Sequence, residues 1–160
     1  MAGVGLDVVF FELRGRRCAL PVATVREVLP MPSVTPVPLA PPCVRGLAAV
    51  HGHAIPVLDL GLWFSAKDSR LDPPPFRSGS DKLILVEATA ARDPAPTRVA
   101  LVVERVMRLG TIDEEHSRPA PPGPTFVIAT VLDIDGPALL VSADQALDHV
   151  RAAIVAAVQS

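Results

Sequence analysis

The pattern of apolar residues at the start of the chain predicts strands. Residues 8–13 (VVFFEL) are mostly β-branched or aromatic and are apolar on both faces, which is typical of a strand buried on both sides. A turn over residues 14–16 lets residues 17–22 return as the second strand of a hairpin. The chain is therefore expected to begin with a β-hairpin.

A short helix and a proline-rich connector are expected next. Within residues 23–29 (ATVREVL) apolar residues recur at i, i+3 and i+4, and Pro30 ends the helix because proline cannot donate the next backbone hydrogen bond. Six prolines between residues 30 and 42 exclude a helix or a central strand there. This tract favours a rigid surface connector over a polyproline ligand.

A second hairpin is predicted around the dipeptide His51-Gly52. The apolar strands over residues 46–50 and 53–58 flank this tip. A two-residue hairpin turn needs positive φ at its centre, which glycine adopts freely and histidine tolerates better than most residues. The tip and its two strands thus agree with one another.

Residue Asp59 can cap a short helix over residues 60–64, in which Trp63 and Phe64 are candidate core anchors. Polar, proline-rich residues 65–81 then predict a loop and a boundary between subdomains.

A third hairpin follows that loop. Residues 82–88 form a strand, residues 91–97 link it, and residues 98–109 return. Alternation along the returning strand predicts one face of Val99, Leu101 and Val103 and another of Ala100 and Val102.

The last third of the chain predicts a loop, a hairpin and a closing helix. Residues 117–124 form a second proline-rich loop, and strands over residues 126–133 and 137–141 flank the turn dipeptide Asp135-Gly136. Residues 142–145 (SADQ) match a capping box. The helix after it carries Leu147, Val150, Ile154 and Val158 on one face.

Many short strands without long intervening helices indicate a mainly β fold of small barrels rather than βαβ units. We expect one domain over residues 6–155, with flexible termini at residues 1–5 and 156–160. The hairpins of the two halves look alike in outline, but no sequence repeat joins them.

Composition narrows the class of protein. The 160 residues are 49% hydrophobic and carry a net charge of −2, which suits one globular domain and gives no footprint for nucleic acid. Residues 1–6 resemble no signal peptide, and no apolar run approaches the roughly 18 residues of a membrane span. Cys18 and Cys43 lack metal-like spacing and are expected to be buried, reduced thiols in the cytoplasm.

The chain offers little catalytic chemistry. It contains no P-loop, no G-x-G-x-x-G after a strand and no G-x-S-x-G. His51 and His53 share one side of a hairpin, but no third ligand follows at a suitable spacing. His116 lies in a solvated acidic turn, and His149 is expected at the exposed edge of the last helix. We expect no catalysis, cofactor or metal, and an unfamiliar enzyme remains a third class.

The stretch over residues 42–60 (PCVRGLAAVHGHAIPVLDL) resembles the chemotaxis coupling, or CheW-like, family. Supporting segments occur in the family's order over residues 10–22, 25–28, 36–42, 99–109 and 139–147, so the resemblance covers about residues 8 to 150. The residues that match the central motif are Gly46, Gly52, Pro56, Asp59 and Leu60.

The resemblance implies two intertwined five-stranded barrels around a shared hydrophobic interior, with no catalysis. It implies a non-catalytic adaptor that couples chemoreceptor tips to a CheA-type histidine kinase, packing against the kinase's related regulatory domain. A stand-alone peptide- or ligand-binding β-barrel in another signalling pathway is the alternative. Expected partner-binding residues are Val25, Glu27, Gly46, His51 and Gly52 in the first half and Val106 and Leu109 in the second, whereas Pro56, Asp59 and Leu60 are expected to be structural.

The chain also departs from the family pattern. His51 stands where the family has arginine, and Ala48 stands where it has asparagine. The family's aspartate-glycine pair is Glu104-Arg105 here, and its glycine-rich stretch is replaced near residues 127–132. The resemblance implies that the family's arginine at position 51 can pair with the glutamate at the position of Glu27. We hypothesise that a Glu27–His51 contact, where it forms, weakens as rising pH removes the imidazole proton. A tolerated turn residue is the alternative reading of His51.

Overall fold

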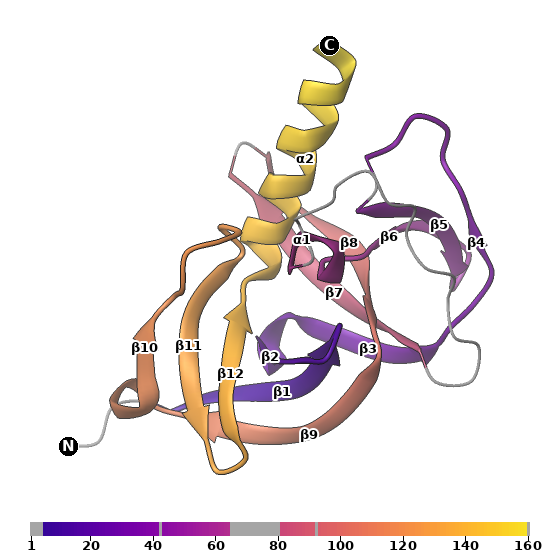
Figure 1. Cartoon of the computed structure of the whole chain (residues 1–160). Helices are drawn as coiled ribbons and strands as arrows, with labels where there is room; N and C mark the ends of the chain where they lie inside the picture. The colour runs from indigo at the N-terminus through magenta and orange to yellow at the C-terminus, as the bar shows by residue number, and fades with distance from the viewer. Residues whose placement is uncertain (1–4, 42, 65–80, 92, 160) are drawn as a thin grey trace.

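The chain forms two curled β-sheets, with a C-terminal helix projecting from them (Figure 1). The computed structural model describes residues 5–41, 43–64, 81–91 and 93–159. Sheet A has the order β10 (Ser117–Pro119), β11 (Val127–Asp133), β12 (Gly136–Val141), β2 (Arg16–Pro21), β1 (Leu6–Leu13) and β9 (Arg105–Ile112). Sheet B has the order β3 (Val25–Pro30), β7 (Lys82–Ala90), β8 (Asp93–Val103), β6 (His53–Leu58), β5 (Val44–Val50) and β4 (Val34–Thr35). The helical elements are η1 (Val22–Thr24), α1 (Gly61–Phe64), η2 (Glu114–His116) and α2 (Ala143–Gln159).

The two sheets share one pairing plan. Edge strands β9 and β3 pair antiparallel with β1 and β7, the first strands of the hairpins β1–β2 and β7–β8. The second strand of each hairpin then pairs parallel with β12 or β6. The hairpins β11–β12 and β5–β6 and the short outer strands β10 and β4 complete each sheet. The mainly β fold is therefore confirmed, with a short sixth strand added to each five-stranded set.

This plan explains how the sheets are intertwined. The first half of the chain gives β1–β2 to sheet A and β3 to β6 to sheet B, and the second half gives β7–β8 to sheet B and β9 to β12 to sheet A. Each sheet, which we call barrel A or barrel B, thus contains strands from both halves. Separating the barrels would require breaking strand pairs in each of them.

The apolar side chains divide into three clusters. One lies inside barrel B, one inside barrel A, and the largest is shared between the barrels. Strand β8 serves two of them, as its alternation predicts: Val99, Leu101 and Val103 face the shared core, and Ala100 and Val102 face the barrel-B interior. Strand β1 is buried on both faces in the same way, between the shared core and the interior of barrel A.

The helix expected over residues 23–29 is wrong. A 3₁₀ turn, Val22–Thr24, leads directly into strand β3, which pairs with β7. Exposure alternates along this strand, with Glu27 and Leu29 half-buried and Val28 exposed. A helix of seven residues forms few internal hydrogen bonds, so pairing with a buried neighbouring strand outweighs its weak apolar periodicity.

The boundaries of two later strands also differ from expectation. Residues 98–109 do not form one strand, because the chain leaves barrel B at Glu104 and enters barrel A. The backbone N–H of Glu104 donates to the carbonyl of Glu12 at 2.9 Å. In the last hairpin Asp133 pairs with Gly136, so the tip is Ile134-Asp135, one residue before the expected turn.

The closing helix is anchored at its beginning. Ser142 caps the helix as expected, since the backbone N–H of Gln145 donates to Ser142 Oγ at 3.2 Å. The second bond of a capping box is replaced, because the Ser142 N–H donates to the carbonyl of Phe126 at 2.8 Å. Asp144 and Asp148 accept hydrogen bonds from two backbone N–H groups near the end of β7, at 2.7 and 2.8 Å. Leu147 and Val150 face the shared core. The side chains of Trp63, Phe64, Ile154 and Val158 and the loop over residues 65–80 lie outside the described residues.

Candidate partner-binding surfaces

The edge strands β3 and β9 present matched side chains. Val28 lies opposite Ile84 and Leu109 lies opposite Val9, and both partners belong to the shared core. The side chain of Val28 is 42% exposed and that of Leu109 is 69% exposed. Each edge strand therefore carries an accessible apolar residue at the same place in the plan. The sequence predictions included Leu109 but not Val28.

Two predicted residues, Val25 and Val106, also occupy matched positions. They pair with Val86 and Phe11, at the start of β3 and β9, and both pack partly buried against the shared core. Val25 and Val106 therefore lie between the exposed residues Val28 and Leu109 and the shared core. The structure thus places Val25 and Glu27 on edge strand β3, and Val106 and Leu109 on edge strand β9. The predicted residues Gly46, His51 and Gly52 belong instead to the hairpin β5–β6.

In barrel B, an ionisable pair links the edge strand to a hairpin tip. Glu27 Oε2 lies 2.7 Å from Nε2 of His51, so the pairing that the family pattern allows between these positions is present. His51 and Gly52 form the tip of β5–β6 with φ of 50° and 81°. The two side chains are 63% and 40% exposed for His51 and Glu27, respectively. We call this contact the barrel-B seam.

In barrel A, the equivalent contact is made by a permanently charged residue. Arg108 of β9 pairs with Asp133 at the end of β11 and, at 3.4 Å, with Asp135 of the tip. Its guanidinium also lies 4.7 Å from the ring centroid of Phe10. Burial alone would raise the pKa of the Asp133 carboxyl, but the hydrogen bond from Arg108 and the charges of Arg108 and Arg17 lower it below its usual value. We call these contacts the barrel-A seam.

The predicted residue Gly46 acts through its backbone. It is buried with φ of 143°, and a Cβ at this position would collide with the carbonyl group of Thr35 in β4. Gly46 therefore lets β4 approach β5 and presents no side chain to a partner. Gly52 is different, because it is exposed and a Cβ there would meet nothing within 4 Å.

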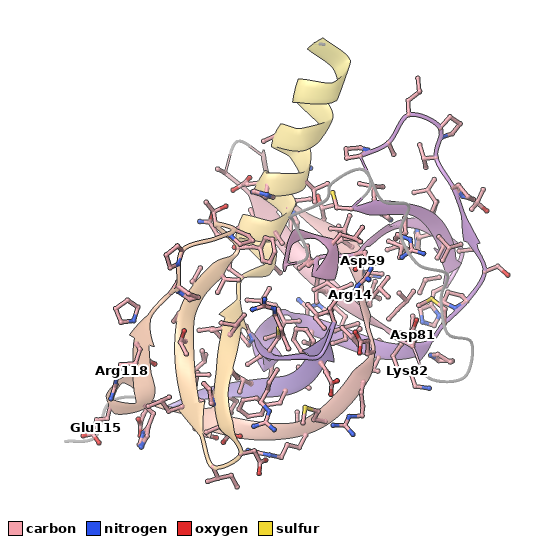
Figure 2. All side chains as sticks on the ribbon, viewed as in Figure 1. Arg14, Asp59, Asp81, Lys82, Glu115 and Arg118 are labelled. Atoms are coloured by element: carbon pink, nitrogen blue, oxygen red, sulfur yellow. The ribbon has the colours of Figure 1, made fainter. Side chains whose placement is uncertain are left out.

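The structural role expected for Asp59 takes a form that the sequence did not suggest. Its carboxylate is 5% exposed and accepts from Arg14 at 3.2 Å and from Arg45 at 2.8 Å. Figure 2 shows Arg14 and Asp59 near the middle of the molecule. Arg14 belongs to the β1–β2 turn of barrel A and Arg45 to β5 of barrel B, so Asp59 ties the two barrels together. Leu60 beside it is fully buried.

The remaining candidate groups offer little chemistry. Among the residues that the structure describes, no three His, Cys, Asp or Glu side chains come together as a metal site would need. Both cysteines are buried, and burial raises the pKa of the Cys18 thiol to about 12, so it stays protonated. Among the described residues, no helix has the length and apolar character to cross a membrane.

Comparison with known proteins decides the family. The model of the CheW-like domain matches residues 7–151. The chain belongs to the CheW-like domain family. The chemotaxis protein CheW of Treponema pallidum (strain Nichols) is 21% identical over 115 residues, which make up 72% of this chain and 63% of that protein. The scaffolding protein TtCheW from Thermoanaerobacter tengcongensis has a solved structure with a TM-score of 0.69 and 24% identity, over 87% of this chain and 90% of that one.

The likeness to TtCheW shows the shared fold, and the two seams are features of this CheW-like domain itself. Sequence reasoning found Glu27 and His51 but missed Arg108, Arg14 and Arg45. The signal for Arg108 was present, because V-R-E-V at residues 25–28 and V-M-R-L at residues 106–109 have the same apolar spacing. Four residues are too few to identify an internal repeat from sequence, and the match becomes meaningful only because β3 and β9 occupy the same place in the two sheets.

Proposed function

We propose that this CheW-like domain is a non-catalytic adaptor that couples chemoreceptors to a CheA-type histidine kinase. The observation that carries the proposal is the matched pair of exposed apolar residues, Val28 and Leu109, on the two edge strands. Interfaces of this kind centre on apolar anchors with charged groups at the rim. Each anchor here lies one residue after a seam residue, Glu27 or Arg108.

Two similar surfaces on one molecule would allow it to bind two partners at once, as an adaptor must. Each barrel ends in an edge strand and a hairpin tip, so the chain carries two similar docking surfaces built on different strands. One surface comprises Val25, Glu27, Val28, His51 and Gly52, and the other comprises Val106 and Leu109 with the barrel-A seam. We propose that the kinase's regulatory domain, itself related in fold, docks on these barrel ends and that a receptor tip packs near Val25 and Val106.

The alternative, a stand-alone ligand-binding barrel, has less support. The described residues form an open surface pocket of about 200 Å³ between Arg16, Val127, Leu139 and the turn over residues 121–124. Sites for small molecules commonly enclose about 300 to 1,000 Å³. This pocket is small for that purpose, and the seams and edge strands lie outside its lining.

The test is binding to the CheA-type kinase regulatory domain and to a receptor-tip fragment from the same organism, measured by biolayer interferometry. Val28→Asp and Leu109→Asp each place a charge at the centre of a proposed surface, and we expect each to weaken binding at its own end about tenfold or more. Leu39→Asp is the matched control, because Leu39 is 98% exposed but lies on the connector between β4 and β5.

The control is expected to bind as wild type. Absence of binding of the unaltered chain to either partner would remove the adaptor function. Equal weakening by Leu39→Asp and by the edge-strand variants would show that the edge strands are not the docking surfaces.

A further inference from the structure

The two seams differ in how their charge depends on pH. In barrel A the cation is Arg108, which stays charged at every physiological pH. In barrel B the cation is His51, and imidazole is the side chain whose charge ordinarily changes between about pH 5 and 8. The cation lies on edge strand β9 in barrel A and on the β5–β6 tip in barrel B, so it is permanent in one seam and conditional on pH in the other.

The barrel-B contact has little electrostatic effect while it is in water. Both side chains are substantially exposed, and exposed ion pairs contribute little to stability because solvent screens them. A partner docked over the edge strand and the tip would exclude that water. Excluding water strengthens the attraction between charges, and it makes a carboxylate without a cationic neighbour costly to cover.

Neighbouring charged groups do not replace the imidazolium in this contact. His53, on β6 beside the tip, is exposed, and the structure records no hydrogen bond or ion pair between its described side chain and Glu27. Arg26 of β3 is directed elsewhere and pairs with Glu87 of β7 at 3.0 Å. Glu27 therefore depends on His51 for a cationic partner among the contacts of the described residues.

We propose that docking at the barrel-B end is proton-sensitive, whereas docking at the barrel-A end is not. This inference rests on the proposed adaptor function and adds regulation to one of its two surfaces. With His51 protonated, a partner covers a paired Glu27. With His51 neutral, the same partner covers a carboxylate whose neighbour carries no charge. Affinity at this end therefore falls as pH rises through the imidazole range.

The backbone permits a direct test by substitution. His51 has φ of 50°, and Arg14 has the same φ of 50° before Gly15 in the β1–β2 turn, so arginine fits this kind of tip. His51→Arg makes the cation permanent. His51→Asn removes the cation, and asparagine tolerates positive φ. His53→Asn is the matched control, because it removes the neighbouring imidazole and leaves the seam intact.

The measurement is the dissociation constant for the CheA-type kinase regulatory domain at about pH 6 and about pH 8, with Leu109→Asp as the background so that only the barrel-B end is read. We expect the affinity of the chain with His51 to fall about fivefold over this range. His51→Arg should bind tightly at both values, His51→Asn weakly at both, and His53→Asn should fall like the unaltered seam.

The outcomes separate the two proposals. A fall of the same size in His51→Arg would place the titrating group in the partner and overturn the proton-sensitive seam while leaving the adaptor intact. Loss of the fall in His53→Asn would likewise overturn it, since the wrong imidazole would then be responsible. No binding by any variant at either pH would remove the adaptor function, and this inference with it.

Discussion

The two halves of the chain build the same strand plan with different side chains at matched positions. In barrel B, the backbone carbonyl of Cys43, just before β5, accepts a hydrogen bond from the backbone N–H of Asp59, just after β6, at 2.7 Å. In barrel A, the backbone carbonyl of Phe126, just before β11, accepts the matching bond from the backbone N–H of Ser142, just after β12, at 2.8 Å. The backbone bonds are thus repeated where the side chains are not. Strand pairing and apolar alternation can maintain a barrel while its polar residues change.

The difference is largest where each hairpin leads into a helix. Asp59 precedes the four-residue helix α1 and holds two arginines, whereas Ser142 precedes the 17-residue helix α2 and caps it. Asp59 therefore joins the two barrels through its ion pairs, whereas Ser142, at the matching position, begins a helix that packs on the shared core. Matched backbone positions in this molecule can carry different tasks.

Asp59→Asn is expected to have the largest effect on stability. The substitution removes the charge that pairs with Arg14 and Arg45 and leaves two largely buried guanidiniums without it. Breaking a buried ion pair from one side costs about 3 to 5 kcal/mol. Urea unfolding should show this loss in the midpoint with little change in slope.

The matched variant is Ser142→Ala, at the equivalent position of the second half. It removes only a helix cap and should cost about 1 kcal/mol. Equal losses for the two variants would contradict the distinction between an inter-barrel tie and a cap.

The next effect is expected at Gly46, whose counterpart at the bulge of β11 is Ala129. Gly46→Ala forces a side chain into the positive-φ region and against the carbonyl of Thr35, which should cost about 2 kcal/mol in urea unfolding. Ala129→Gly should cost about 1 kcal/mol or less, through backbone entropy and lost packing. A harmless Gly46→Ala would show that β4 can move away from β5.

The sequence predicted most of the strands because their apolar patterns and turns agree. Residues 46–58 illustrate this, since alternation, the His51-Gly52 tip and the observed register coincide. The prediction failed over residues 23–29, where β-pairing with a distant strand, β7, decides the structure. Local spacing carries no information on that partner. The structural repeat of the two sheets was also missed from sequence, because each barrel takes strands from both halves of the chain and local spacing does not show which strands pair.

The site was predictable only in part for a related reason. Glu27 and His51 are 24 residues apart and were linked through the family pattern, and the structure confirms their contact. Arg108 and Asp133 belong to strands whose meeting depends on how barrel A curls. No spacing in the sequence predicts that closure. The residues of the two docking surfaces therefore remain proposals that rest on matched geometry.

A smaller effect is expected from the seams themselves. Glu27→Gln should change the unfolding free energy by no more than about 0.5 kcal/mol, since its pair with His51 is exposed. Arg108→Gln should lower the thermal midpoint more, because Asp133 is 13% exposed and loses its main cation. Equal, negligible shifts would remove the distinction between the two seams.

The barrel-A seam also predicts a response to acid. The pKa of Asp133 is lowered in the folded state, so the carboxylate stabilises the fold above its unfolded value of 3.8 and this contribution is lost as pH falls through the lower folded value. Arg108→Gln should weaken that loss. Unfolding free energies measured at intervals below about pH 5 would show an unchanged acid response if Asp133 were not coupled to Arg108.

The smallest effect is expected on α2, the element in which the two halves differ most in length. His149 lies 5.8 Å from Phe126, ring to ring, in an edge-on arrangement, and burial lowers the pKa of its imidazole below the usual 6.5. As pH falls below 6.5 the unfolded chain takes up a proton that the folded chain still excludes, so His149 destabilises the fold progressively toward acid until its lower folded value is passed. His149→Gln should flatten the pH dependence of the thermal midpoint just below 6.5, whereas His53→Gln, at an exposed position, should leave it unchanged. An equal response in both variants would assign the effect to general charge and not to the packing of α2 on the shared core.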